Sequence, residues 1–246
     1  MLRVIHATKD YVAFNKPAGM LVHGIKGFEE RTAGHTVADR AVKDYPEISR
    51  VGDDPATRPG IVHRLDKDTS GVIVIARNQA FFSFMKHLFQ NHQVKKTYLA
   101  LVNGRLLGKG VVDLPIGLKP GTVKRSTRAR DMKMVKEAVT EYEVVKVYQK
   151  SVLEGRGATY YSLVRVTPRT GRTHQIRVHL ASIGHPIVGD TLYGPKANGL
   201  GLERQFLHAE SIEFSTPDGN RVRLEAELPP ELQKVIDALE AERHRT

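Results

Sequence analysis

Residues 60–90 read GIVHRLDKDTSGVIVIARNQAFFSFMKHLFQ, and they combine a polar loop, a buried strand and an amphipathic helix. The run 72–76 is apolar and rich in β-branched residues, as in a strand that is covered on both faces. Asn78 is a favoured N-cap residue, and the apolar residues after it recur every three or four positions. We therefore predict a strand followed at once by a helix, whose aromatic residues pack into the core.

The rest of the chain is predicted to hold more strands than helices, and several strands follow one another directly. This order favours an α+β fold with a largely antiparallel sheet. At 246 residues the chain is long enough for one catalytic domain built from two lobes. We expect further strands at 3–6, 11–15, 97–102, 111–114, 138–148, 160–166, 206–214 and 221–226, and helices at 36–44, 173–183 and from near Pro229 onward.

Two of these helices have a distinct apolar face. We expect Thr173 to be the N-cap of the helix 173–183. Residues three or four apart lie on one face of a helix, so each apolar set should pack inward. These sets are Ile176, Leu180 and Ile183 in the first helix, and Leu232, Val235, Ile236 and Leu239 in the last one.

The charge of the chain is unevenly distributed. It has 38 Lys and Arg against 27 Asp and Glu, and the net charge is +11. Residues 203–246 hold 10 acids and 6 bases, so residues 1–202 carry +15. A body this basic favours a polyanionic partner such as nucleic acid, although many basic proteins bind none.

Cysteine is absent, which excludes disulfides, thiolate nucleophiles and cysteine-based zinc sites. The N-terminal residues lack the apolar stretch of a signal peptide, and the longest apolar runs are the length of a strand. We therefore expect a cytoplasmic protein with no membrane partner.

Three polar segments differ from ordinary scaffold. The first is the loop 60–71, where Asp66 lies among His63, Arg64, Lys67 and Asp68. A single aspartate in a loop is usually a turn former. The crowd of charged and titratable neighbours weakens that interpretation, and loops held by rigid elements are where catalytic groups usually lie.

The second segment is 170–179, TGRTHQIRVH. In the predicted helix, His174 and Arg177 lie on a different face from the apolar residues. An arginine at the edge of a buried face needs a carboxylate or phosphate partner. Asp66 is a candidate, and the pair would lower the pKa of that carboxyl and keep it ionised. The alternative is a surface arginine without a partner.

The third segment is 117–136, which holds seven Lys or Arg and one acid, Asp131. Because it also contains Pro120 and Gly121, we predict a mobile basic loop. A solvated run of charge is the usual explanation of such a segment, but the +15 on the same part of the chain favours contact with phosphates. The basic residues are Lys119, Lys124, Arg125, Arg128, Arg130, Lys133 and Lys136.

A metal site is a weaker interpretation of the histidines. His174 and His179 are five residues apart, which places them about 140° apart around a helix, so they cannot share one ion. His63 and Asp66 could be ligands, but no further cluster completes a site. We predict that the protein uses no metal, and no Walker-type or dinucleotide glycine motif indicates a cofactor.

Four segments, in this order, closely resemble the motif regions of the RluA family of pseudouridine synthases. They are VAFNKPAGMLVH at 12–23, GIVHRLDKDTSGVIVIARN at 60–78, KKTYLALVNG at 95–104 and TGRTHQIRVHLASIGHPIVGD at 170–190. With the weaker FLHA at 206–209, the resemblance covers nearly the whole chain.

The resemblance implies a mixed, mostly antiparallel sheet in two lobes with a central RNA-binding cleft. Many relatives carry a small RNA-binding domain before the catalytic one, but this chain begins almost at the first motif, so we expect a single catalytic domain over residues 1–246 without that N-terminal domain. The expected substrate is structured RNA (ribosomal RNA, transfer RNA or both) and the expected product is pseudouridine. An isomerisation adds and removes nothing, so no cofactor is expected. We expect a monomer.

The resemblance also implies roles for individual residues. Asp66 corresponds to the catalytic aspartate, Tyr98 to the tyrosine that stacks on the base, and Arg177 to the basic partner of the aspartate. Arg64 corresponds to the arginine that enters the RNA when the uridine is flipped out, a step that base chemistry in a duplex requires. We predict that His63, Arg172, His174, Lys124, Arg125 and Arg128 also contact RNA.

Two other functions were weighed against this one. A non-catalytic RNA-binding or ribosome-assembly factor fits the charge, but it gives no reason for Asp66, Tyr98 and Arg177 to match the family together. A metal-dependent nuclease or phosphodiesterase that uses His63, Asp66 and His174 would lose activity with a chelator, and it is the weakest of the three.

Overall fold

The computed structural model describes residues 2–24, 34–122, 124–128, 132–151 and 158–243. The chain forms two compact units. Unit 1 consists of Met1–Lys96 and Ala209–Glu227, and unit 2 of Thr97–His208 and Leu228–Thr246. In the part of the chain that is described, none of the helices is long and apolar enough to cross a membrane.

Unit 1 is built on a sheet whose central strand is the one predicted after the polar loop. All seven residues of β3 are buried, because neighbouring strands and a helix cover it. Strand β2 pairs with both β1 and β3 in antiparallel register. The order is β1-β2-β3-β11, with β12 on β11. These strands are β1 (Arg3–Ala7), β2 (Tyr11–Lys16), β3 (Ser70–Ala76), β11 (Leu207–Ser215) and β12 (Arg221–Glu225).

The helices of unit 1 begin where the sequence predicts. The side chain of Asn78 caps α3 (Gln79–Gln90) by accepting a hydrogen bond from the backbone N–H of Phe81. Thr36 caps α2 (Val37–Asp44) in the same way, and a 3₁₀ helix, η1 (Pro46–Arg50), follows. The ring of Phe81 stacks on Tyr11 of β2 at 5.1 Å, so α3 packs on the sheet through its aromatic face, as predicted.

Gly71 allows two strands of unit 1 to approach closely. Its φ is +121°, and a Cβ atom at this position would lie 2.2 Å from the carbonyl oxygen of Ala209 in β11. Only glycine combines this backbone conformation with this space. The start of β3, directly after the Asp66 loop, is therefore held against β11.

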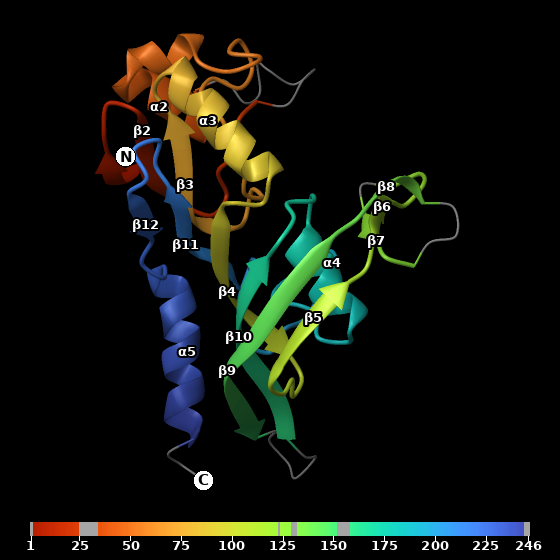
Figure 1. Cartoon of the computed structure of the whole chain (residues 1–246). Helices are drawn as coiled ribbons and strands as arrows, with labels where there is room; N and C mark the ends of the chain where they lie inside the picture. The colour runs from red at the N-terminus through yellow and green to blue at the C-terminus, as the bar shows by residue number, and fades with distance from the viewer. Residues whose placement is uncertain (1, 25–33, 123, 129–131, 152–157, 244–246) are drawn as a thin grey trace. The chain divides into compact units, whose positions relative to one another are not determined.

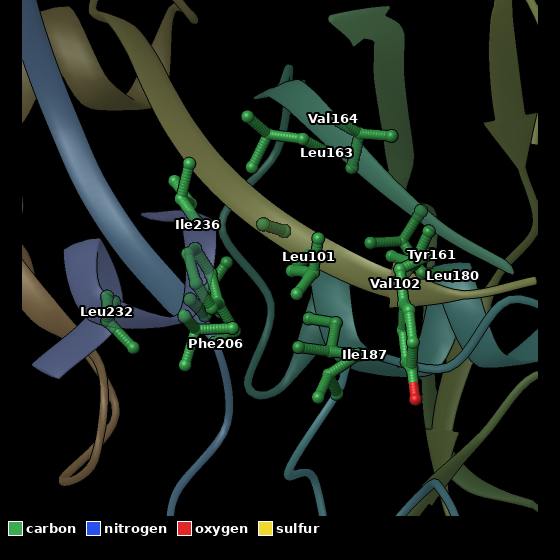
Figure 2. Close-up of a cluster of buried hydrophobic side chains, with 14 of the residues drawn as sticks. Leu101, Val102, Tyr161, Leu163, Val164, Leu180, Ile187, Phe206, Leu232 and Ile236 are labelled. Atoms are coloured by element: carbon green, nitrogen blue, oxygen red, sulfur yellow. The ribbon is translucent and has the colours of Figure 1, made fainter. Parts of the chain in front are cut away.

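The larger sheet of unit 2 is antiparallel, in the order β4-β10-β9-β5. Its core combines residues from β4, β9 and β10 with the predicted apolar faces of α4 and α5 (Figure 2). Both predicted faces are confirmed, with Ile183 partly buried and the other members buried. The elements are β4 (Lys95–Asn103), β5 (Lys109–Asp113), β9 (Val139–Ser151), β10 (Ala158–Pro168), α4 (Gln175–Ser182) and α5 (Pro230–Arg243).

The sequence predicted a mobile loop for the basic segment 117–136, and this prediction is wrong for part of it. The segment contributes a second, three-stranded sheet in the order β7-β6-β8, drawn in green beside α4 in Figure 1. The strands are β6 (Ile116–Leu118), β7 (Arg125–Ser126) and β8 (Lys133–Lys136). They were missed because they are short and because β8, exposed at all four residues, has no apolar alternation. Arg130 and Asp131 lie outside the described residues.

The start of α4 also differs from the prediction. The N-cap is His174, in the left-handed conformation with φ 57°, and not Thr173. The turn before the helix is instead held by the side chain of Gln175. Its Oε1 accepts hydrogen bonds from the backbone N–H of Arg172 and from the Thr170 hydroxyl, at 2.9 and 2.7 Å.

Candidate active site

The loop that carries Asp66 is fixed at both ends within unit 1. Before it, Ile61 forms an isolated bridge with Ile75 of β3. Within it, Leu65 is buried and the backbone N–H of Thr69 donates to the carbonyl of Asp66 at 3.1 Å. The Asp66 side chain itself is half-buried. The backbone of Asp66 is therefore held by buried neighbours on either side.

Lys16 joins a second loop to the Asp66 loop. Its side chain is fully buried at the end of β2, and its ammonium donates to the carbonyls of Pro17, Met20 and Lys67 at 2.9, 2.8 and 2.9 Å. These acceptors match the three N–H groups of a lysine. Since Lys67 directly follows Asp66, the backbone of the aspartate loop is tied to the turn 17–20. Lys16 was not among the predicted site residues, although a lysine that ends an apolar strand is a usable signal.

His63 supports the loop from inside. Its Nε2 accepts the backbone N–H of Val74 at 2.9 Å, and its ring stacks on Phe89 of α3 at 5.2 Å. Burial, with the charge of Lys96 adding to it, lowers the pKa of His63 to about 3. The ring is therefore neutral at physiological pH and offers no positive charge to a phosphate. Its contact with RNA stays a prediction.

Lys96 lies near the same aromatic ring. Its ammonium is 5.9 Å from the centroid of the Phe89 ring, and burial lowers its pKa to about 8. Arg64, in contrast, has an exposed side chain. Lys67 in the same loop is exposed as well. The contact of Arg64 with RNA stays a prediction.

In unit 2, Arg177 forms a buried bidentate ion pair with Asp190. Its Nε lies 2.7 Å from Oδ2 and its Nη2 lies 2.9 Å from Oδ1. The two residues are 8% and 1% exposed, so the alternative of a partnerless surface arginine is wrong. The expected carboxylate partner exists, but the sequence analysis did not name Asp190. Asp66 belongs to unit 1, and its pairing with Arg177 stays a prediction.

The ring of Tyr193 also contacts Arg177. The guanidinium carbon of Arg177 lies 5.2 Å from the centroid of the Tyr193 ring. The Tyr193 hydroxyl lies 2.9 Å from Nδ1 of His174, and the two rings meet edge to face at 5.7 Å. His174 and Arg177 are therefore brought together, as their positions on the helix predicted, by a tyrosine that the sequence analysis missed.

Tyr98 lies in β4, opposite Val166 of β10. It is partly buried and packs against the main core of unit 2. The core thus supports the ring while part of it stays accessible, as a stacking platform for a base requires. Its role in stacking stays a prediction.

The remaining predicted RNA-binding residues gather around α4 and the small sheet. Arg128 donates to the carbonyl of Ser182, at the C-terminal end of α4, at 3.0 Å, and Arg172 donates to the carbonyl of Glu137 at 3.0 Å. Lys124 is exposed and Arg125 is half-buried in β7. Among the residues that the structure describes, no three potential metal-ligating side chains (His, Cys, Asp or Glu) form a group.

The family model for RNA pseudouridylate synthase matches residues 10–182. The chain belongs to this family. Two solved human structures, RNA pseudouridylate synthase domain containing 1 and domain containing 4, both superpose with a TM-score of 0.71. Their identities are 24% and 27%; the first match covers 98% of this chain and 95% of that one, and the second covers 97% and 93%. The predicted α+β fold of this family is confirmed.

Curated relatives extend the similarity over most of the chain. An uncharacterized RNA pseudouridine synthase of Chloroflexus aurantiacus is 40% identical over 92% of this chain and 66% of its own length. Ribosomal large subunit pseudouridine synthase D of Nitrosomonas europaea is 37% identical over 97% of this chain and 65% of its own length. The tRNA pseudouridine synthase C of Pasteurella multocida is 35% identical over 88% of this chain and 86% of its own length. The chain thus spans about two thirds of the length of the first two.

Proposed function

We propose that this protein is an RNA pseudouridine synthase that isomerises uridine in ribosomal or transfer RNA, with Asp66 as the catalytic carboxylate. The observation that carries the proposal is the family match across the loop that presents Asp66. The buried Lys16 fixes the backbone of that loop, so the carboxylate is preorganised in the way that a catalytic group requires.

The reaction breaks the bond from the ribose C1′ to N1 of uracil and forms a bond from C1′ to C5. The proton on C5 is released and N1 gains a proton, so substrate and product have the same atoms and no oxidant or reductant takes part. Two roles of the Asp66 carboxylate fit this balance. It can attack the substrate and form a covalent intermediate, or it can remove a proton from the ribose.

Three further residues have distinct tasks in this proposal. Tyr98 stacks on the uracil after it leaves the helix, which compensates for lost base stacking. Arg64 fills the space that the uridine leaves in the RNA. Arg177 is the proposed basic partner of the Asp66 carboxylate. The guanidinium is already oriented for a contact by Asp190.

RNA phosphates are expected along the basic part of unit 2. Lys124, Arg125 and Arg128 lie on or beside β7, while Arg172 and His174 precede α4. Arg128 reaches the C-terminal end of α4 through the carbonyl of Ser182. The net charge of +15 on residues 1–202 favours a polyanion as partner. Each cation that contacts a phosphate should contribute to the salt dependence of binding.

The test is the replacement Asp66→Asn, assayed by tritium release from RNA labelled at C5 of uridine. We expect loss of product with RNA affinity largely retained, because the amide keeps the size of the side chain but removes its charge. Asp44→Asn is the matched control, since Asp44 is an exposed aspartate at the end of α2 in the same unit. Full activity of Asp66→Asn would refute the role of Asp66.

The same assay separates the competing functions and substrates. A wild-type protein that binds RNA but releases no tritium from total cellular RNA would be a non-catalytic RNA-binding factor. Parallel reactions on ribosomal and transfer RNA decide between the two substrate classes, which are those named for the relatives in Nitrosomonas europaea and Pasteurella multocida.

A further inference from the structure

The hydroxyl of Tyr193 makes two polar contacts in unit 2, and the proposed reaction assigns it no role. Its oxygen accepts the backbone N–H of Arg125 at 2.9 Å and lies 2.9 Å from Nδ1 of His174. A hydroxyl can accept one hydrogen bond while it donates another, so both contacts can form at once. Arg125 belongs to β7 of the small basic sheet, and His174 is the N-cap of α4. One oxygen atom therefore connects that sheet to the start of the helix that carries Arg177.

The ring of Tyr193 makes a separate set of contacts. It packs against a small cluster formed by Ile116 of β6, Ala138 and Val178 of α4. One face of the ring meets the guanidinium of Arg177 at 5.2 Å. Phenylalanine thus removes the hydroxyl alone, and leucine removes the hydroxyl together with the ring.

The backbone of Tyr193 is itself tied to the ion pair. Its N–H donates to Oδ1 of Asp190 at 3.2 Å, and this oxygen also accepts from Nη2 of Arg177 at 2.9 Å. The position of the tyrosine is therefore coupled to the orientation of Arg177. A shift of Tyr193 would therefore disturb the contacts of Arg177 and of the basic sheet.

The small sheet has limited packing of its own. Strand β8 is exposed at all four residues, and the side chain of Met134 is among the most exposed large apolar groups of the described chain, at 69%. The polar contacts to α4 and its neighbourhood, from Tyr193 to Arg125 and from Arg128 to Ser182, accordingly have a large share in orienting the sheet.

We propose that Tyr193 is a positioning residue that fixes the basic sheet relative to the helix of Arg177. RNA phosphates held by the sheet and the base near Arg177 are then presented in one fixed register. This inference rests on the proposed function, because it assumes that the sheet binds the RNA substrate. Misplacing a substrate-positioning element reduces productive binding even when the reacting groups are intact.

The experiment compares Tyr193→Phe, Tyr193→Leu and the control Tyr161→Phe. Tyr161 also uses its hydroxyl in unit 2, donating to the carbonyl of Asn198 at 3.3 Å, but it lies in the core. Steady-state tritium release from a labelled transfer or ribosomal RNA transcript gives KM and kcat. Hydrogen exchange of peptides that contain Arg125 reports the hydroxyl contact independently of activity.

For Tyr193→Phe we expect faster exchange at Arg125 and a KM raised about fivefold, the effect of losing one hydrogen bond, with kcat nearly unchanged. The salt dependence of KM should not change, because no cation is removed. Tyr193→Leu should also lower kcat, since Arg177 loses the ring beside it. Tyr161→Phe should match the wild type in KM and in exchange at Arg125.

Equal KM values for Tyr193→Phe and Tyr161→Phe would overturn the inference, and so would faster exchange at Arg125 with an unchanged KM. If the wild-type protein forms no product, the proposed function fails, and the dissociation constant for the same RNA then decides the inference. About fivefold weaker binding by Tyr193→Phe would support it, and equal binding would overturn it.

Discussion

Replacing Asp190 with asparagine tests how firmly the buried ion pair holds Arg177. Oδ1 of Asp190 accepts from Nη2 of Arg177 and from the backbone N–H groups of Leu192 and Tyr193, and asparagine can keep an oxygen there. Its amide nitrogen then replaces Oδ2, which lies 2.7 Å from Nε of Arg177. Two hydrogen-bond donors would face each other, and a buried guanidinium would lose its counter-charge.

The expected loss of stability follows from these contacts. Breaking a buried ion pair by removing one partner costs about 3–5 kcal/mol. Because asparagine retains three of the four hydrogen bonds, we expect the lower end, about 3 kcal/mol. For a chain of this size that corresponds to a fall in Tm of about 6–12 °C. In the tritium assay kcat should fall more than KM rises, since Arg177 is held less well near the reacting base.

Urea unfolding followed by far-ultraviolet circular dichroism measures the free energy of unfolding. The control is Glu143→Gln, which removes one partner of the exposed pair that Glu143 forms with Lys109 at 2.9 Å. Exposed pairs contribute at most about 1 kcal/mol. If Asp190→Asn costs no more than this control, the pair does not hold Arg177 in the way argued, and the reasoning is refuted.

Two further predictions concern unit 1. Lys16→Met leaves the carbonyls of Pro17, Met20 and Lys67 without the ammonium that they share. We expect the free energy of unfolding in urea to fall by about 2–4 kcal/mol and tritium release to be at least about tenfold slower. Each buried acceptor left unpaired costs about 1–3 kcal/mol, and this cost is partly offset because the ammonium no longer has to be buried. Wild-type values for both would contradict this prediction. His63→Gln tests pH dependence. Burial lowers the pKa of His63 to about 3, so protonation favours the unfolded chain. The contribution to stability is complete above pH ~6.5 and is lost as the pH falls toward 3. The loss amounts to at most about 1.4 kcal/mol per pH unit. Glutamine can accept the Val74 N–H but does not titrate, so unfolding measured between pH ~6.5 and ~4.5 should depend less on pH in the variant, and equal dependence would contradict the prediction.

Local sequence was sufficient for several elements of unit 1. Strand β3 and helix α3 follow from a β-branched run, a capping asparagine and an apolar period, and the structure has both. The small sheet could not be predicted in this way. Its strands are two to four residues long, and they pair because of what lies beside them rather than because of an internal pattern.

The site shows the same division. The sequence indicated that Arg177 needs an anionic partner, but Asp190, 13 residues away, meets it only after the chain has turned back. Lys16 reaches the carbonyl of Lys67 across 51 residues, and Tyr193 reaches Arg125 across 68. The lysine at the end of an apolar strand signals that Lys16 needs acceptors, but the local sequence does not tell which distant carbonyl it meets, and nothing near Tyr193 indicates its contact with Arg125.

The amino-acid sequence by itself determined the fold class, the family and the residues that carry its motifs, because periodicity, capping and motif order are properties of neighbouring residues. The tertiary structure decided which side chains hold those motif residues in place. Whether a buried lysine or arginine finds a partner depends on which distant segments folding brings within about 3 Å of it, the range of a hydrogen bond, and burial then makes each such contact costly to lose.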